Sequence, residues 1–357
     1  MAYSGTVGTT VIDVQTLIEH GARRCGKLAE ELTSEQQVSA RESLFFFLSH
    51  LANRGIQYWC IQKNIVGAKP EEYIYSLPAG TVDALNVLYR TMDRPTGTVA
   101  SSAGGVVANA FDGDIDTFCQ QASAAGNISI DYGIGQNTYV ASVGFLPYVS
   151  GGGSQTWSYV FESSADGITW NPLYTGTNVA ITDGVWVWQD IDPGASVPYY
   201  RMRATGATTL ALRELYFGTN GREIQMSRLN RDDYTNLPNK NFTSNRPLQY
   251  WFDRTIPQPA MYLWPSSDTY APQLVVWRHR QIQDVGSLSG ELEIPQRWYL
   301  AIQNMLAHQM AMELPMIDPG RMAYCEQQAD KYWQMAEQEE RDKSPIYFAP
   351  NISYYTR

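Results

Sequence analysis

The chain has 357 residues, more than one ordinary hydrophobic core accommodates, so two domains are expected. Charged residues make up only 17% of it and aromatic residues 12%, which excludes a disordered chain and is typical of a well-buried or heavily interfacial protein. The net charge of -10 argues against a general nucleic-acid binder, because contact with phosphates needs clustered Lys and Arg.

The first flank, residues 1–95, contains a predicted helix over 33–55. A capping box of Thr33 with Gln36 marks its start, and Gly55 marks its end. Leu44, Leu48 and Leu51 share one face, and the phenylalanines 45–47 spread the apolar surface around the helix. We therefore expect this helix to be buried on more than one side, against its own fold or a neighbour. Short strands are predicted next, at "IQYWCIQKNIV", "EEYIYSLP" and "ALNVLYR".

The middle of the chain, residues 96–220, has a different composition. It holds 17 of the 28 glycines, and ten acidic residues against three arginines and no lysine. Alternation of apolar and polar residues recurs in short segments separated by turn residues, which predicts an antiparallel β-sandwich. These segments are "NISIDYG", "YVASVGFLPYV", "SYVFESS", "VWVWQDI", "PYYRMRAT" and "LRELYFG".

The second flank, residues 221–357, resembles the first in its pattern of predicted strands and helices. Strands are predicted at "PLQYWFDRT", "AMYLWPS" and "PQLVVWRHR", and helices over 295–315 and 318–343. The tail after residue 343 has two prolines and four aromatic residues, and we expect it to be an arm that docks on another surface. The predicted fold class is therefore α+β: one discontinuous, helix-rich domain of 1–95 and 221–357 with a small β-sheet, interrupted by an all-β insert at 96–220.

The stretch "NAFDGDIDTFCQ", residues 109–120, carries three alternating aspartates and resembles a calcium loop at first sight. An EF-hand loop counted from Asp112 needs Gly at its sixth position and Glu at its twelfth, where this chain has Thr117 and Ser123. The EF-hand interpretation is therefore excluded.

Motifs of known catalytic chemistry are missing from the sequence. It has no Walker A, HExxH, GxSxG or dinucleotide fingerprint, so we expect a protein that is not an enzyme. His279 in "WRHRQ" fits either a nucleic-acid-facing patch or one exposed face of a strand. No apolar run approaches the ~20 residues of a membrane helix, so no membrane partner is expected.

The insert resembles the discoidin family, also called the coagulation factor V/VIII type C or galactose-binding-like domain. The resemblance lies in "NAFDGDIDTF", with Phe118 where Trp is expected, in "YVFESSADGITWNPL" and in "YYRMRATGATTLALRELYFG". It implies a jelly-roll sandwich. It also implies a structural calcium ion, with oxygen ligands that suit this cation. The implied ligands are Asp112, Asp114, Thr117 and Glu214; alternatively, these aspartates only cap turns.

The family's ligand site lies on loops at one end of the sandwich, where exposed aromatic rings would stack on sugars. Candidates in this chain are Tyr148, Trp157 and Trp186. For each of them, a position in the sandwich core or on a strand face is the alternative.

The flanks resemble the head-to-tail adaptor proteins of tailed phages, of the podovirus tail accessory or tail tubular type. The ordered features are "LSHLANRGIQYWCIQKNI", "YSLPAGTVDALNVLYR", "IQMSRLNRDDYTNLPNKNFTSNRPLQYWFDR", "MYLWPSSDTYAPQLVVWRHRQIQDVG" and "IPQRWYLAIQNMLAHQMAMELP". They cover most of 1–95 and 221–357. The resemblance implies a ring, usually twelve-fold, that lies under the capsid portal in the neck of the virion and extends the DNA channel. An acidic channel would let DNA pass without specific binding.

The implied partners are the portal protein, the tail tube or nozzle protein, further copies of the chain and a tail fibre, with assembly in the cytoplasm of the bacterial host. Four unpaired cysteines suit that compartment. The aromatic tail residues are the candidates for contact with portal or neighbours: Tyr347, Phe348, Tyr354 and Tyr355. Two other hypotheses stay open. One is a lectin-like carbohydrate-binding protein whose flanks only support the insert, and the other is an enzyme with a carbohydrate module.

Overall fold

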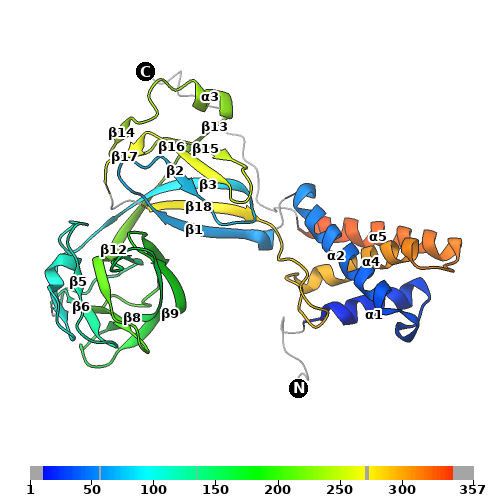
Figure 1. The fold of residues 1–357 in the computed structure, drawn as a ribbon, viewed down its shortest axis with the longest axis horizontal. Helices are drawn as coiled ribbons and strands as arrows, with labels where there is room; N and C mark the ends of the chain where they lie inside the picture. Colours follow the sequence, from blue (N-terminus) through cyan, green and yellow to red (C-terminus); the bar gives the residue numbers. More distant parts are fainter. Residues whose placement is uncertain (1–10, 56–57, 134, 270–272, 341–357) are drawn as a thin grey trace. The chain divides into compact units, whose positions relative to one another are not determined.

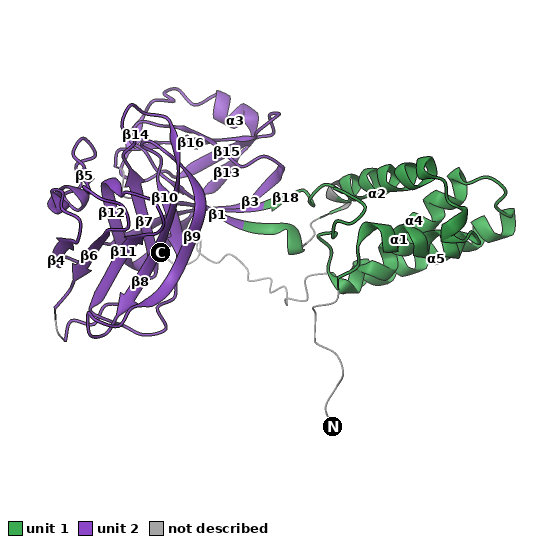
Figure 2. Cartoon of the chain, turned by 60° about the horizontal axis from the view of Figure 1, so that its bottom comes forward, with its two compact units in different colours: residues 1–62, 279–357 green, residues 63–278 purple. Residues whose placement is uncertain are grey.

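The computed structural model describes residues 11–55, 58–133, 135–269 and 273–340 (Figure 1). The chain divides into two compact units, which Figure 2 distinguishes by colour. Residues 1–62 and 279–357 form the helical unit, and residues 63–278 form the strand unit. The strand unit thus combines the predicted insert with strands from both flanks.

The helical unit packs four helices around one core: α1 (Val14–Cys25), α2 (Ser34–Arg54), α4 (Tyr299–Glu313) and α5 (Pro319–Glu339). The predicted capping box is confirmed, since the Thr33 side chain accepts from the Gln36 amide. The three leucines predicted to share a face are all buried. Every helix among the described residues is too short or too polar to cross a lipid bilayer.

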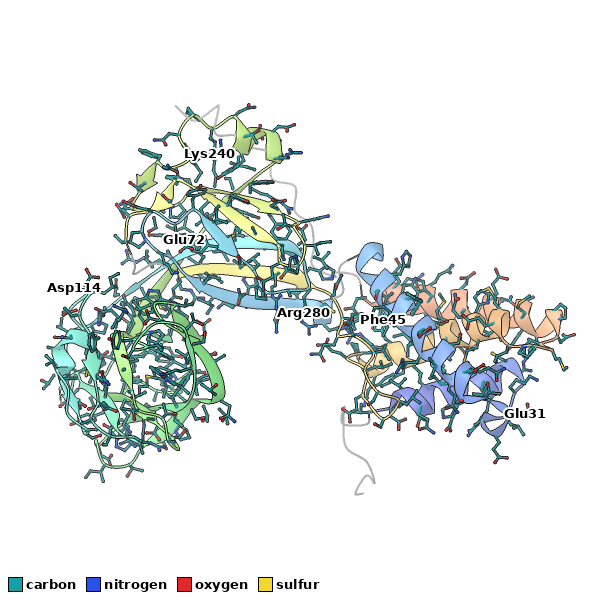
Figure 3. All side chains as sticks on the ribbon, viewed as in Figure 1. Glu31, Phe45, Glu72, Asp114, Lys240 and Arg280 are labelled. Atoms are coloured by element: carbon teal, nitrogen blue, oxygen red, sulfur yellow. The ribbon has the colours of Figure 1, made fainter. Side chains whose placement is uncertain are left out.

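Two further features of this unit bear on the sequence-based expectations. The phenylalanines of α2 were expected to spread its apolar surface, so that the helix is buried on more than one side, against its own fold or a neighbour. Within this chain Phe45 is 36% and Phe46 67% exposed, and Figure 3 labels Phe45 on α2. Their side chains point away from the face that the three leucines present to the core. Helix α1 was not predicted from the sequence, although Asp13 caps it: its carboxylate accepts from the Thr16 amide at 2.8 Å.

The predicted sandwich at 96–220 is confirmed as an all-β structure of two sheets. Its first sheet has the order β4-β6-β11-β8-β9. In its second, β12 pairs with both β5 and β7, and β7 pairs with β10. The aromatic core between the sheets is centred on Phe145, which contacts Trp157, Tyr159 and Phe161. The strands are β4 (Thr98–Ser101), β5 (Cys119–Gln120), β6 (Asn127–Asp131), β7 (Ser142–Pro147), β8 (Ser154–Ser164), β9 (Asn171–Thr182), β10 (Val187–Asp190), β11 (Tyr199–Ala204) and β12 (Ala211–Gln225).

Strand β12 is shared between the sandwich and the flanking strands. Its first part pairs with β7, and its second part pairs antiparallel with β3 (Thr81–Asp93), with Thr219 opposite Asp93. The chain therefore leaves for the sandwich and returns from it on neighbouring strands. The continuous sheet runs β1-β18-β3-β12-β7-β10, where β1 is Ile61–Gly67 and β18 is Gln273–Arg280.

A second group of flanking strands forms a four-stranded sheet of order β13-β15-β16-β2. Its buried side chains share a core with those of β3 and β18. Beside it lie a two-stranded sheet and the short helix α3 (Arg231–Thr235). The strands of these two sheets are β2 (Ile74–Ser76), β13 (Ser227–Leu229), β14 (Thr243–Ser244), β15 (Gln249–Asp253), β16 (Ala260–Trp264) and β17 (Ser266–Ser267).

One outer face of the sandwich is covered by flanking strands. Trp186, Trp188 and Tyr216 are buried there in a small apolar cluster with Ile65 of β1 and with Met92 of β3. The backbone of β1 approaches so closely that a Cβ on Gly67 would lie 2.5 Å from the Cβ of Trp186. Glycine is therefore needed at this contact, which holds Trp186 against the flank.

Candidate functional site

The acidic loop, residues 109–118, folds around its threonine. The Thr117 hydroxyl oxygen lies 2.9 Å from Asp112 Oδ2, 3.1 Å from the Asp114 carbonyl and 3.4 Å from the Asn109 carbonyl. One hydroxyl hydrogen can serve only one of these three acceptors. The other oxygen of Asp112 and the carboxylate of Asp114 accept backbone amides two residues further on, at 2.9 and 3.0 Å. Both aspartates therefore stabilise turns, and several oxygens converge beside them.

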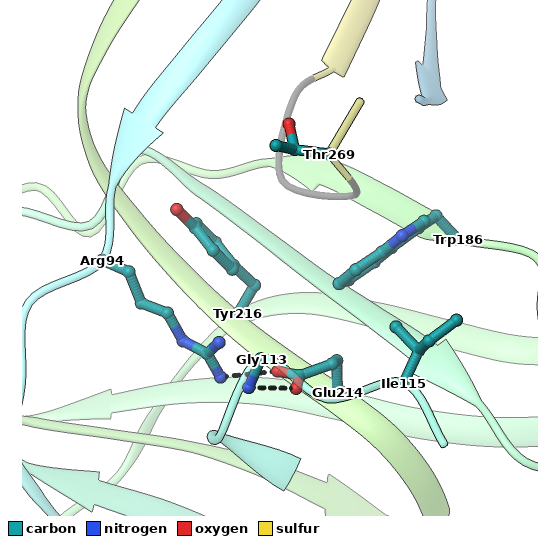
Figure 4. A pocket seen from close by; sticks show the side chains of 7 residues that line it. All are labelled: Arg94, Gly113, Ile115, Trp186, Glu214, Tyr216 and Thr269. Carbon is teal, nitrogen blue, oxygen red and sulfur yellow. Dashed lines mark hydrogen bonds and ion pairs between the residues drawn. The ribbon is translucent and has the colours of Figure 1, made fainter. Parts of the chain in front are cut away.

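Glu214, near the start of β12, lies under this loop and is only 3% exposed. Its Oε1 accepts from the Gly113 amide at 2.6 Å, and its Oε2 forms an ion pair with Arg94 Nη2 at 2.8 Å (Figure 4). Burial raises the pKa of Glu214 to about 7, because desolvation outweighs the favourable effects of Arg94 and Gly113. Asp112 nearby raises this pKa further. A carboxyl group of this kind is common in functional sites.

Arg94 enters this place from the short connection between β3 and β4. Besides its ion pair, Nη2 donates to the carbonyls of Leu215 at 2.9 Å and of Ala110 at 3.1 Å. The guanidinium also lies over the rings of Phe111 and Tyr216, at 5.5 and 5.2 Å from their centroids. These contacts hold the guanidinium in one position, so Arg94 and Glu214 form a fixed pair of opposite charges.

A pocket of about 300 Å³ opens beside this pair, and we call it the Glu214 pocket (Figure 4). Trp186, Tyr216 and Ile115 supply apolar walls, and the charged pair supplies polar groups. Thr269 reaches the pocket from the segment after β17. The indole nitrogen of Trp186 is buried and has no hydrogen-bond partner among the described residues. The arrangement thus combines aromatic surface with a donor and an acceptor, as ligand pockets do.

Of the three predicted ligand residues, one lines this pocket. Trp186 is its aromatic wall, and its other neighbour is Trp188, stacked at 4.9 Å between ring centroids. Trp157 is 3% exposed in the sandwich core, stacked on Phe145. The strand alternation turns Trp157 inward, so its ring is not accessible to a ligand.

Tyr148, the third predicted residue, is half-buried at the end of β7. Its ring stacks on Phe118 at 3.9 Å between centroids, and the Arg213 guanidinium lies over it at 5.1 Å. Arg213 in turn donates to the carbonyl of Ile115 and pairs with Asp183. The acidic loop therefore occupies the surface of Tyr148 that was expected to receive a sugar.

The remaining predicted residues are the tail aromatics and the calcium candidates. The four tail aromatics, Tyr347, Phe348, Tyr354 and Tyr355, lie outside the described residues. Of the calcium candidates, the structure brings Asp112, Thr117 and Glu214 to one loop, with Asp114 contributing its carbonyl oxygen. Among the described residues there is no group of three or more His, Cys, Asp or Glu side chains that could hold a metal.

Three residues of the pocket were not predicted as site residues from the sequence: Arg94, Tyr216 and Thr269. Arg94 lies just before the predicted insert, and no local pattern links it to the acidic loop or to Glu214. Thr269 is distant in sequence from every other residue of the pocket, and no local pattern marks it.

Residues 96–215 match the family model described as F5/8 type C domain. Similar solved structures include a CBM62 from Clostridium thermocellum Xyl5A, 24% identical, which covers 36% of this chain and 97% of its own with a TM-score of 0.31. CBM32-1 from a family 31 glycoside hydrolase of Clostridium perfringens is 19% identical. It covers 35% of this chain and 96% of its own, with a TM-score of 0.30. The CBM32 of AlyQ, in complex with 4,5-unsaturated mannuronic acid, is 21% identical. It covers 35% of this chain and 95% of its own, with a TM-score of 0.29.

No curated protein matches the chain. The family match covers the sandwich and stops short of both flanks. The insert is thus a discoidin-like domain of the F5/8 type C family.

Proposed function

We propose that this protein binds carbohydrate and that the Glu214 pocket holds one sugar residue. The observation that carries the proposal is the pairing of an aromatic wall, Trp186, with the fixed pair Arg94 and Glu214. The apolar face of a sugar ring stacks on aromatic side chains. Its hydroxyl groups both donate and accept, so neighbouring hydroxyls match a carboxylate beside a guanidinium. The F5/8 type C match of residues 96–215 supports this assignment.

The volume of the pocket suits a small ligand. About 300 Å³ corresponds to roughly ten water molecules at ~30 Å³ each, enough for one sugar ring.

Replacing Trp186 with alanine is expected to weaken sugar binding at least tenfold, about 1.4 kcal/mol, because the stacking surface is lost. The measurement is calorimetric titration of the full chain with galactose, lactose, N-acetylglucosamine and chitotriose. Trp170→Ala is the matched control, since Trp170 lies in the same sandwich, contacts Arg201 and does not line the pocket.

Trp186 also packs against β1, so its removal can disturb the fold. Glu214→Gln is the second variant: it keeps the size of the side chain and an oxygen for the Gly113 amide, but removes the charge. Weakened binding in both variants, with Trp170→Ala unchanged, supports the pocket. Unchanged binding in both variants, or no binding of any sugar by the parent chain, contradicts the proposal.

We also propose a structural calcium ion at the acidic loop, held by oxygens of Asp112, Asp114 and Thr117. Glu214, the fourth predicted ligand, instead binds the Gly113 amide and Arg94. The observation in favour is the group of oxygens around the Thr117 hydroxyl, which has one hydrogen for three acceptors. Carboxylate, carbonyl and hydroxyl oxygens are the ligands that this cation takes. The ion would fix the loop that forms one edge of the Glu214 pocket.

Calcium is expected to stabilise the chain by about 2.7 kcal/mol at a hundredfold excess over Kd, measured as a rise in Tm relative to chelator. Asp112→Asn is expected to reduce this rise, while Asp116→Asn is expected to leave it unchanged. The Asp116 side chain has no contact in the described structure that ties it to this oxygen group. Equal melting temperatures with calcium and with chelator would contradict the proposed calcium site.

A second candidate function is the phage adaptor ring. The favouring observation is the exposed aromatic pair Phe45 and Phe46 on α2, with ring centroids 5.6 Å apart, since clustered aromatics are enriched at protein interfaces. In this proposal the flanks form the ring at the neck of the virion, portal and tail tube bind above and below, and the sandwich binds a fibre or a glycan. DNA would pass through the lumen.

The ring is tested by native mass spectrometry of the chain with and without the portal protein of its phage. A closed oligomer is expected for the parent chain on the portal, and Phe46→Ala is expected to shift it toward monomer. Leu28→Ala is a control, because Leu28 is similarly exposed, at 60%, but lies outside α2. A chain that stays monomeric under both conditions argues against the ring.

A further inference from the structure

We infer that the sugar site extends into a second subsite made by the flanking strands, so that the protein takes a saccharide of at least two residues. This inference rests on the proposed function. It concerns a second cavity of about 220 Å³, the Lys69 cavity, lined from the flank by Gly67, Lys69, Glu72 and Tyr75 and from the sandwich by Val185 and Trp186.

Trp186 connects the two cavities, because it lines both of them. It is the last residue before β10, and the close approach of Gly67 holds it in place. A sugar residue in the Glu214 pocket and a second one in the Lys69 cavity would therefore contact the same indole. The shared indole is thus the point where the two subsites meet.

The Lys69 cavity has polar groups of the right kind for hydroxyls. Lys69 Nζ and Glu72 Oε2 form an ion pair at 3.5 Å, and each side chain is 37% exposed. Figure 3 labels Glu72 on the segment that leads into β2. The Tyr75 hydroxyl bonds to the Lys69 amide at 3.0 Å and fixes this segment. A donor and an acceptor thus stand side by side, as Arg94 and Glu214 do in the first pocket.

The two cavities draw on different parts of the sequence. The Glu214 pocket is formed mainly by the F5/8 type C domain, and the Lys69 cavity mainly by β1, β2 and the turn between them. The flank then does more than carry the sandwich: it sets the length of saccharide that binds. A single sugar would use the first pocket alone.

The test compares saccharide lengths on the full chain. N-acetylglucosamine, chitobiose and chitotriose, and galactose against lactose, are titrated calorimetrically. The parent chain is expected to bind the di- and trisaccharide of a preferred series at least tenfold more tightly than the monosaccharide. Lys69→Ala and Glu72→Gln are each expected to remove most of this gain and to leave monosaccharide affinity unchanged.

Glu71→Gln is the matched control, because Glu71 is the exposed neighbour of Glu72 and does not line the cavity. Equal affinity for all lengths, or equal losses for mono- and trisaccharide in the Lys69 and Glu72 variants, overturns the second subsite and leaves the first pocket standing. Absence of binding by every saccharide, or binding that survives Trp186→Ala and Glu214→Gln, overturns the proposed function and this inference together.

Discussion

Replacing Arg90 with alanine is expected to lower the free energy of unfolding of the strand unit by about 3 kcal/mol. The Arg90 side chain is only 5% exposed and lies where the sandwich meets the flanking strands. Removing one partner of a buried ion pair leaves its partners uncompensated, which costs about 3 to 5 kcal/mol. The lower end applies here, because the partner carboxylates keep some access to water.

The contacts of Arg90 explain why it matters. Its Nη1 donates to Asp190 Oδ1 at 2.6 Å and its Nη2 to Glu223 Oε1 at 2.5 Å. Asp190 belongs to β10 of the sandwich, whereas Glu223 lies on the flanking half of β12. Burial alone would raise the pKa of Asp190, but bonds from Arg90 and Lys63 hold it below its ordinary value. The carboxylate therefore stays ionised and ties the sandwich to the flank.

The expected loss is measured by urea unfolding of the parent chain and the variant under one set of conditions. Arg254→Ala is the matched control: this arginine is 65% exposed, and its ion pair with Asp83 is 3.3 Å long. An exposed pair contributes less than about 1 kcal/mol, so little change is expected. If Arg90→Ala costs no more than Arg254→Ala, the buried network does not hold the sandwich in place.

Local patterns were sufficient for much of the fold. Alternation of apolar and polar residues predicted the sandwich, and the Thr33 capping box predicted the start of α2. The predicted strand "LRELYFG" is confirmed but too short, because β12 continues to Gln225. Its second half pairs with β3 but is exposed. It therefore lacks the run of apolar residues by which a buried central strand is recognised in a sequence.

The candidate site was harder to predict, since it depends on which face of a strand is covered. Trp157 and Trp186 both occur in or beside segments whose sequence predicts a strand, yet Trp157 points into the core and Trp186 toward the flank. The fixed pair Arg94 and Glu214 joins residues far apart in the chain, which no spacing rule connects. Only tertiary packing brings these groups together.

Replacing Trp298 with alanine is expected to destabilise the helical unit by about 3 to 5 kcal/mol, the usual cost of truncating a buried tryptophan. Trp298 is 3% exposed and lies just before α4. Its ring contacts Trp59 at 5.3 Å and Trp333 of α5 at 5.1 Å between centroids, and its indole nitrogen donates to Glu340. The variant would leave a cavity where these elements meet.

Hydrogen exchange followed by mass spectrometry shows which elements lose stability in the Trp298→Ala variant. Faster exchange is expected in α2, α4 and α5 and not in β3 or β12, because the helical and strand units are separate compact units. Phe46→Ala is the control, since a ring that is 67% exposed contributes little to folding. Equal acceleration in β3 and β12 would mean that both units unfold as one cooperative block. In that case the Arg90 network would stabilise the helices as well as the sandwich, and Arg90→Ala should accelerate exchange in α4.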